Sequence, residues 1–171
     1  MRFASGDGFD YAIGRAEAAY DGKLTRAERT VVYLRPATVI VRDSLAGKEA
    51  HTWEWNIHAL NRMTELAPTQ VAIRNGPAQM CVEMVSGPEV GFTQTDQFTA
   101  RPSSGVNQWH GTFVTKAKSN AAEFVVVMRV GSDCGAKPRG AAAAAKRAGE
   151  ATEVTVDGRV VRFEGETVTV R

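Results

Sequence analysis

Apolar and polar residues alternate with a period of two along most of this chain. The clearest example is residues 51–60, in which the apolar positions are Trp53, Trp55, Ile57 and Ala59 and the polar positions are Thr52, Glu54, Asn56 and His58. Successive side chains of a β-strand point to opposite faces, so this segment is predicted to be a half-buried strand. We expect its apolar row to lie in a core, because burying one large side chain contributes about 1.5–3 kcal/mol.

Two long alternating runs precede this segment, at residues 25–35 and 38–45. Pro36 and Ala37 lie between them, and proline presets the backbone of a turn, so the two runs are predicted to pair as a hairpin. Residues 46–49 are then expected to form a loop. Residues 9–20 are predicted to be a first strand or an extended lead-in.

More alternating runs follow, at residues 70–75, 79–86, 110–116, 121–130 and 152–171. The first two are predicted to pair through Asn75-Gly76-Pro77. The next two are predicted to form another hairpin in the middle of a sheet. The last run splits into three short ones, and its Asp157-Gly158 pair favours a hairpin because both central positions must accept a positive φ.

Two stretches lack a clear alternation. Residues 87–108 are mostly polar and are predicted to be the longest irregular segment. Residues 135–149 contain five alanines in a row, but a run this short between glycines is marginal as a helix, so we expect a surface loop with at most a turn or two of helix. Together these patterns predict an all-β fold, an antiparallel β-sandwich of about a dozen strands, as a single domain over residues 1–171.

Three of the predicted strands are apolar on both faces, at residues 31–34, 39–41 and 124–130. A strand in a two-layer sandwich has one buried and one solvated face, so these runs do not fit a sandwich that stands alone. We therefore expect one outer sheet face to lie against another domain or a second chain.

Composition narrows the class of protein. The 171 residues are 43% apolar and 23% charged, with 21 basic and 19 acidic residues and a net charge of +2. These values are typical of a soluble globular domain, and the scattered basic residues give no support to nucleic-acid binding. No apolar run reaches the roughly 20 residues that cross a bilayer, and the N-terminus shows no export signal. The sequence leaves open whether Cys81 and Cys134 form a disulfide, and it contains no zinc-binding pattern.

The candidate ligand-contacting residues are Glu54, Asn56, His58, Trp109 and Arg29. A carboxylate, an amide and an imidazole along one strand face are able to hydrogen-bond the hydroxyl groups of a ligand, and a guanidinium binds carboxylates bidentately. The alternative is that the same residues form a solvated face. Trp53 and Trp55 are expected in the core, whereas Trp109, beside a polar loop, is equally consistent with a core or an exposed position.

Four stretches of the sequence resemble the C-terminal region of heparinase II/III-like polysaccharide lyases, at residues 16–20, 26–36, 39–43 and 51–58. In that family a strand ending in Arg-Pro or a similar turn leads to a strand ending in Asp, and then to a strand that resembles His-x-Trp/Tyr-Glu-Trp-x-x-His. The resemblance implies a β-sandwich packed behind an α-helical toroid, in enzymes that cleave uronic-acid polysaccharides by β-elimination. It also implies a periplasmic or secreted location.

The family's catalytic and zinc-binding motifs are not found in this chain, so no catalytic residue, metal ligand or cofactor is assigned. The resemblance therefore predicts a C-terminal accessory domain of a larger lyase, not catalytic by itself, whose partners are an acidic polysaccharide and a helical domain or second chain. One alternative is a free-standing carbohydrate-binding module. Another is an independent enzyme. Its candidate acid-base residues, the only ones expected near one another, are His51, Glu54, His58 and His110.

Overall fold

The computed structural model describes residues 1–97, 107–131, 134 and 142–171. Within these ranges the chain forms fifteen strands in three antiparallel sheets and one short 3₁₀ helix, η1 (Glu17–Tyr20). In the same ranges, no helix has the length and apolar character needed to cross a membrane. The all-β class is confirmed, and the number of strands exceeds the dozen expected.

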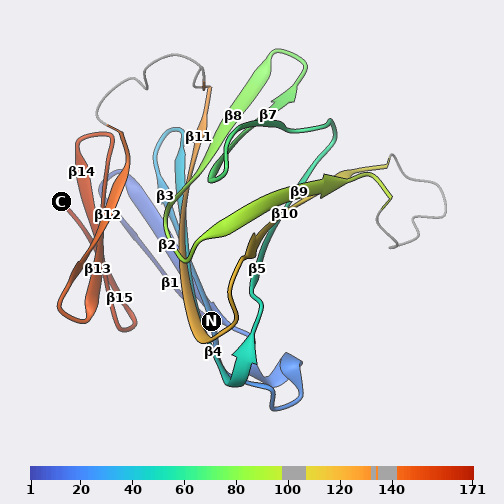
Figure 1. The fold of residues 1–171 in the computed structure, drawn as a ribbon. Helices are drawn as coiled ribbons and strands as arrows, with labels where there is room; N and C mark the ends of the chain where they lie inside the picture. Colours follow the sequence, from blue (N-terminus) through green and yellow to red (C-terminus); the bar gives the residue numbers. More distant parts are fainter. Residues whose placement is uncertain (98–106, 132–133, 135–141) are drawn as a thin grey trace.

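The largest sheet has eight strands in the order β1-β2-β3-β4-β11-β8-β7-β6 and lies in the middle of the molecule (Figure 1). Its strands are β1 (Arg2–Gly6), β2 (Phe9–Arg15), β3 (Leu24–Leu34), β4 (Thr38–His51), β6 (Thr64–Ala67), β7 (Gln70–Asn75), β8 (Ala78–Ser86) and β11 (Ser119–Val130). The predicted pairings of β3 with β4 and of β7 with β8 are confirmed.

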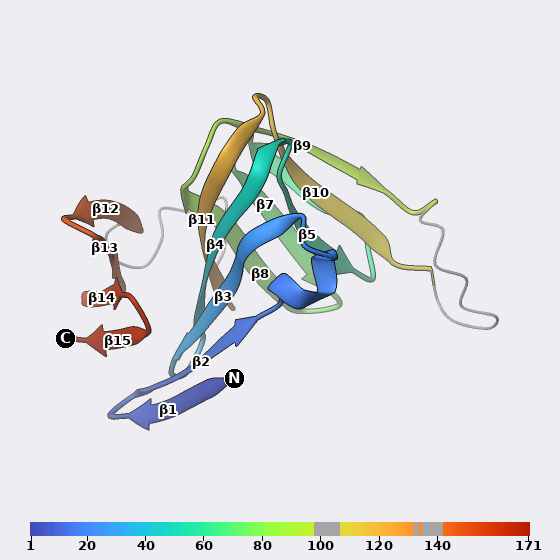
Figure 2. The same cartoon turned by 90° about the horizontal axis from the view of Figure 1, so that it is seen from below.

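Two smaller sheets lie on opposite faces of this middle sheet (Figures 1 and 2). The three-stranded sheet has the order β5 (Glu54–Ala59), β10 (Trp109–Thr115), β9 (Val90–Thr95). The four-stranded sheet has the order β12 (Ala144–Ala148), β13 (Ala151–Val156), β14 (Arg159–Glu164), β15 (Thr167–Val170). The molecule is thus a sandwich of three layers.

Each face of the middle sheet has its own core. Val41, Phe124 and Val126 belong to the core beneath the three-stranded sheet, together with Trp53, Trp55 and Phe113. Residues that alternate with them in β4 and β11, together with two residues of β3, belong to the core beneath the four-stranded sheet, and these are Ile40, Val125, Val127, Val32 and Leu34. Most residues of the runs that are apolar on both faces are therefore buried or half-buried within this chain, although Tyr33 and Val130 are exposed. They do not require a partner, and a partner domain or second chain stays a prediction.

The connections between layers correct two predictions. Residues 46–49 are not a loop, because β4 continues through them and pairs with both β3 and β11. The runs expected to form a second hairpin, β10 and β11, do not pair with each other. β10 lies between β5 and β9, whereas β11 lies between β4 and β8, where both its faces are buried.

Short strands occupy segments that were expected to be irregular. β9 lies within residues 87–108, and β12 lies within residues 135–149. β12 pairs along its length with β13, and Ala145 packs against the second core, so tertiary pairing overrides the helix preference of alanine there. Residues 98–106 and 135–141, to which the same predictions also applied, lie outside the described residues.

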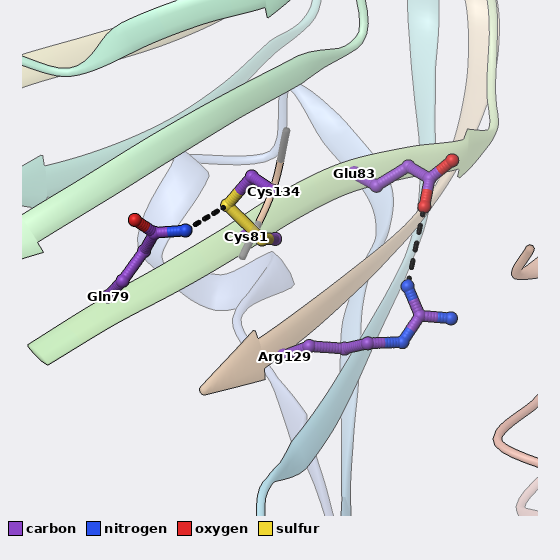
Figure 3. The surroundings of a disulfide bond; sticks show 5 residues. All are labelled: Gln79, Cys81, Glu83, Arg129 and Cys134. Carbon is purple, nitrogen blue, oxygen red and sulfur yellow. Dashed lines mark hydrogen bonds and ion pairs between the residues drawn. A yellow bond between two sulfur atoms is a disulfide. The ribbon is translucent and has the colours of Figure 1, made fainter. Parts of the chain in front are cut away.

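The two cysteines form a disulfide, with an S–S distance of 2.01 Å (Figure 3). It joins Cys81 in β8 to Cys134, which follows β11 on the way to the four-stranded sheet. Gln79 donates a hydrogen bond to the sulfur of Cys134 at 3.3 Å. The disulfide therefore links Cys134, which lies between β11 and the four-stranded sheet, covalently to the middle sheet.

Candidate functional site

A cleft of 710 Å³ opens where β2, β3, β4 and η1 approach the start of β5. Three of the five predicted contact residues line it, namely Arg29 from β3 and Glu54 and Asn56 from β5. β3 and β5 belong to different sheets, so the three-layer arrangement brings these residues together. His58 and Trp109 are not among the lining residues of the cleft.

Arg29 is held against the cleft wall by Asp43 of the neighbouring strand. Its Nε and Nη2 donate to the two carboxylate oxygens of Asp43, both at 2.7 Å. The side chain of Asp43 is 7% exposed and that of Arg29 is 53% exposed, so a buried carboxylate orients a half-exposed guanidinium. These hydrogen bonds raise the pKa of Arg29 above its usual value, against the opposing effect of burial. The result is a permanent cation in a fixed orientation.

The 3₁₀ helix η1 forms a rim of the cleft and places Tyr20 there. Glu17, its first residue, accepts a hydrogen bond from the backbone N–H of Ala27 in β3 at 3.2 Å. Backbone hydrogen bonds to its carboxylate, from Glu17 itself and from Ala27, lower the pKa of Glu17. Glu17 therefore links the rim to the middle sheet. Nothing in the sequence pattern indicated this helix.

The outer face of the three-stranded sheet continues the polar wall beyond the cleft. The strand register places Asn56 beside Thr112 and Thr112 beside Thr93, and it places His58 beside His110 and His110 beside Thr95. The hydroxyl of Thr112 donates to Oδ1 of Asn56 at 2.8 Å. This face thus carries two rows of polar side chains that can donate and accept hydrogen bonds. Thr112 and Thr93 were missed because the pairing of β10 with β5 and of β9 with β10 is not visible in local alternation.

The three tryptophans are mostly covered by protein. Trp53 and Trp55 are 5% and 3% exposed, which confirms that they are core residues. Trp109 is half-buried at the margin of the same core, and the guanidinium of Arg62 lies 5.5 Å from the centre of its ring. A bound sugar ring would have to compete with Arg62 for that aromatic surface.

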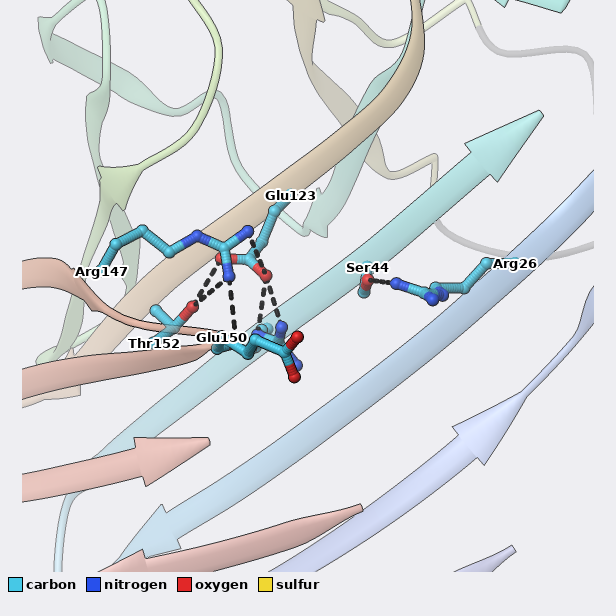
Figure 4. Close-up of polar contacts among 7 residues, drawn as sticks. Arg26, Ser44, Glu123, Arg147, Glu150 and Thr152 are labelled. Carbon is cyan, nitrogen blue, oxygen red and sulfur yellow. Dashed lines mark hydrogen bonds and ion pairs between the residues drawn. The ribbon is translucent and has the colours of Figure 1, made fainter. Parts of the chain in front are cut away.

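A second cleft, of 740 Å³, lies between the middle sheet and the four-stranded sheet. Its charged side chains bind one another: Arg42 donates from Nε to Glu123 at 3.0 Å, and Arg15 donates to Glu28 at 2.9 Å. Glu123 also accepts a hydrogen bond from Thr152 of β13 at 2.8 Å and lies near Arg147 of β12 (Figure 4). These contacts connect two layers, so we assign this cleft a structural role.

The fold was compared with known proteins at the level of sequence and of structure. No protein-family model and no curated protein sequence matches the chain. Solved structures do match: heparinase III, the BT4657 gene product, has a TM-score of 0.70 at 12% identity over 92% of this chain and 26% of its own. A second heparinase III has a TM-score of 0.67 at 16% identity, covering 95% of this chain and 26% of its own. Heparan sulfate lyase HepC from Pedobacter heparinus has a TM-score of 0.68 at 9% identity, covering 99% and 27%.

These identities are low, so the likeness establishes the fold and not the activity. The chain spans about a quarter of the length of the enzymes that it matches. The β-sandwich expected from the sequence resemblance is therefore confirmed at the level of structure. This chain has the fold of a β-sheet region found within heparinase III enzymes.

Proposed function

We propose that this chain is the β-sandwich part of a polysaccharide lyase that cleaves uronic-acid polysaccharides by β-elimination, and that it forms one wall of the substrate cleft. The fold it shares with heparinase III enzymes over 92% of its length supports this proposal. So does the convergence of Arg29, Glu54 and Asn56 in one cleft, which is the observation that carries it.

The chemistry of the wall suits an acidic sugar. The guanidinium of Arg29, oriented by Asp43, is placed to bind a uronate carboxylate. Asn56, Thr112 and Glu54 offer donors and acceptors for ring hydroxyls. In this proposal these residues bind and orient the chain of sugars, while the base that removes the C5 proton comes from the helical part of the enzyme. The chain is then not catalytic by itself.

The proposal extends to compartment and partners. The Cys81–Cys134 disulfide favours a protein that matures in an oxidising environment, as exported proteins do. The proposed partners remain an acidic polysaccharide and a helical domain. Since the central strands β3, β4 and β11 of the middle sheet are covered on both faces within the chain, we place the contact with a helical domain at the rim of the cleft.

A free-standing carbohydrate-binding module is the rival proposal. Such modules stack exposed aromatic rings on sugars, and here Trp53 and Trp55 are buried and Trp109 is half-buried beneath Arg62. This arrangement favours hydrogen bonding and charge over stacking as the means of sugar recognition.

Affinity electrophoresis of the tag-free chain tests the proposal. Gels containing alginate, hyaluronan or heparan sulfate should retard the chain relative to gels containing neutral starch. Arg29→Ala and Asn56→Ala should abolish most of the retardation. A matched pair serves as control: Thr93→Ala, on the polar face, should weaken it, whereas Thr169→Ala, on the exposed side of the four-stranded sheet, should not.

Two results would contradict the proposal. If no uronic-acid polysaccharide retards the chain, the chain does not form a wall of a substrate cleft. Formation of unsaturated uronates, detected by ultraviolet absorbance on incubation of the chain alone with these glycans, would show that it carries its own catalytic base.

A further inference from the structure

Two of the three histidines of the chain meet on the outer face of the three-stranded sheet. His58 in β5 and His110 in β10 occupy directly opposite positions in the strand register. Their rings are 4.6 Å apart between centres and inclined at 72°. Nε2 of His58 and Nδ1 of His110 are separated by 3.0 Å, on an exposed part of the surface. They lie 52 residues apart in sequence, so no local motif indicated the pair.

The distance between these two nitrogens matches the distance between two imidazole ligands of one metal ion. Zinc binds imidazole nitrogens at about 2.0–2.1 Å, so two such ligands at angles between octahedral and tetrahedral values lie about 2.9–3.4 Å apart. The observed 3.0 Å falls inside that interval. A dication at that bond length lies off the line that joins the two nitrogens, so it replaces the hydrogen bond between the rings once the side chains turn toward it.

We propose that Nε2 of His58 and Nδ1 of His110 form a bidentate site for a borderline transition-metal dication of the zinc type. Neutral imidazole nitrogens suit zinc, copper and nickel, whereas magnesium and calcium prefer oxygen ligands. Among the described residues, no group of three or more His, Cys, Asp and Glu side chains is placed to hold a metal ion. In that part of the chain, the two imidazoles are therefore the only His, Cys, Asp or Glu ligands that the site offers.

Such a site uses the second polar row of the same sheet face, and metal binding there does not depend on the sugar-binding proposal above. The Asn56–Thr112 row is the next outward-facing row of the same sheet, two residues along each strand. A metal ion held by two imidazoles would keep open positions on the side facing solvent. It would thus present a Lewis-acidic centre at the end of a polar surface.

Isothermal titration calorimetry of the tag-free chain with zinc chloride tests this proposal. We expect one zinc ion per chain, and no heat of binding with magnesium chloride. His58→Gln and His110→Gln should each weaken zinc binding by about tenfold or more, because each removes one of two ligands. Glutamine keeps a polar side chain at the surface, so both variants should remain folded, as checked by circular dichroism.

The third histidine supplies the control. His51 lies beside Trp53, with ring centres 5.6 Å apart, and not in the pair. His51→Gln should bind zinc with the affinity of the unmodified chain. The proposal is overturned if the chain does not bind zinc, if either His58→Gln or His110→Gln binds it within twofold of the unmodified chain, or if His51→Gln loses binding.

Discussion

The two outer sheets cover the same middle sheet but differ in what they present to solvent. On the four-stranded sheet, Glu153 binds Arg162 at 3.0 Å and Lys146 at 3.3 Å, so charged side chains pair across strands. On the three-stranded sheet, the outward side chains include amide, hydroxyl and imidazole groups, such as Asn56 hydrogen-bonded to Thr112, and Glu54 lies on the same face. The first surface satisfies its charges internally. The second keeps hydroxyl, amide and imidazole groups at a surface that continues into the cleft, which is why we assign recognition to it.

The largest expected effect on stability comes from truncating one large side chain in either core. Phe163 beneath the four-stranded sheet and Phe113 beneath the three-stranded sheet are 1% and 0% exposed. Phe163→Ala and Phe113→Ala should each lower the free energy of unfolding by about 3–5 kcal/mol, measured by urea denaturation. Similar losses with one transition would show that both outer sheets belong to one cooperative unit. A loss below about 1 kcal/mol for Phe163→Ala would mean that the third layer is not docked in solution.

The disulfide should matter next, and specifically to the third layer. Removing it in Cys81→Ser/Cys134→Ser should cost about 2–4 kcal/mol, because it closes a long loop between the middle sheet and the segment leading to β12. Urea denaturation with and without dithiothreitol measures the cost. The reductant should not change the stability of the double variant. Equal stability of the oxidised and reduced chain would contradict a structural role for this bond.

Trp53 and Trp55 allow a finer comparison within the first core. Nε1 of Trp53 donates to the backbone oxygen of Ser119 at 3.0 Å, whereas Nε1 of Trp55 is buried and has no hydrogen-bond partner among the described residues. Trp53→Phe should therefore destabilise the fold more than Trp55→Phe, by about 1 kcal/mol, since only the former loses a hydrogen bond. Thermal and urea unfolding of the two variants measure the difference. The opposite order would show that Trp55 finds a partner in solution.

The smallest expected effect concerns the charged surface of the four-stranded sheet. Hydrogen bonds from Arg162 and then Lys146 lower the pKa of Glu153 in the folded chain. Its contribution to stability is therefore present above the pKa of the unfolded chain and is lost as pH falls through the lower folded value. Glu153→Gln should slightly destabilise the chain at pH 7 and have no effect at pH 2. An equal effect of Glu153→Gln at both pH values would show that these ion pairs do not contribute to the stability of the folded chain.

Much of the fold was predictable because strict alternation identifies strands. The run around Trp53 and Trp55 and the turn at Asp157-Gly158 were placed correctly, and both turn residues have positive φ. Alternation does not say which sheet a strand joins, however, so β10 and β11 were wrongly paired. The same ambiguity suggested an external partner where the chain covers its own second face.

Three residues that line the candidate cleft were singled out from the sequence, but their assembly into a cleft was not predictable. Arg29 and Glu54 stood out as charged residues on strands, yet their common cleft depends on two sheets crossing near the start of β5. The pairing of His58 with His110 depends on a register between strands 52 residues apart. Such long-range pairings leave no trace in the local pattern of a single sequence.

The most direct test of the recognition surface is a two-dimensional NMR titration of the chain with a uronic-acid oligosaccharide. We predict that backbone shifts change around Arg29, Glu54, Asn56 and Thr112, and that the amides of β12–β15 do not respond. Changes confined to the four-stranded sheet, or no changes at saturating oligosaccharide, would contradict the assignment of recognition to the polar wall.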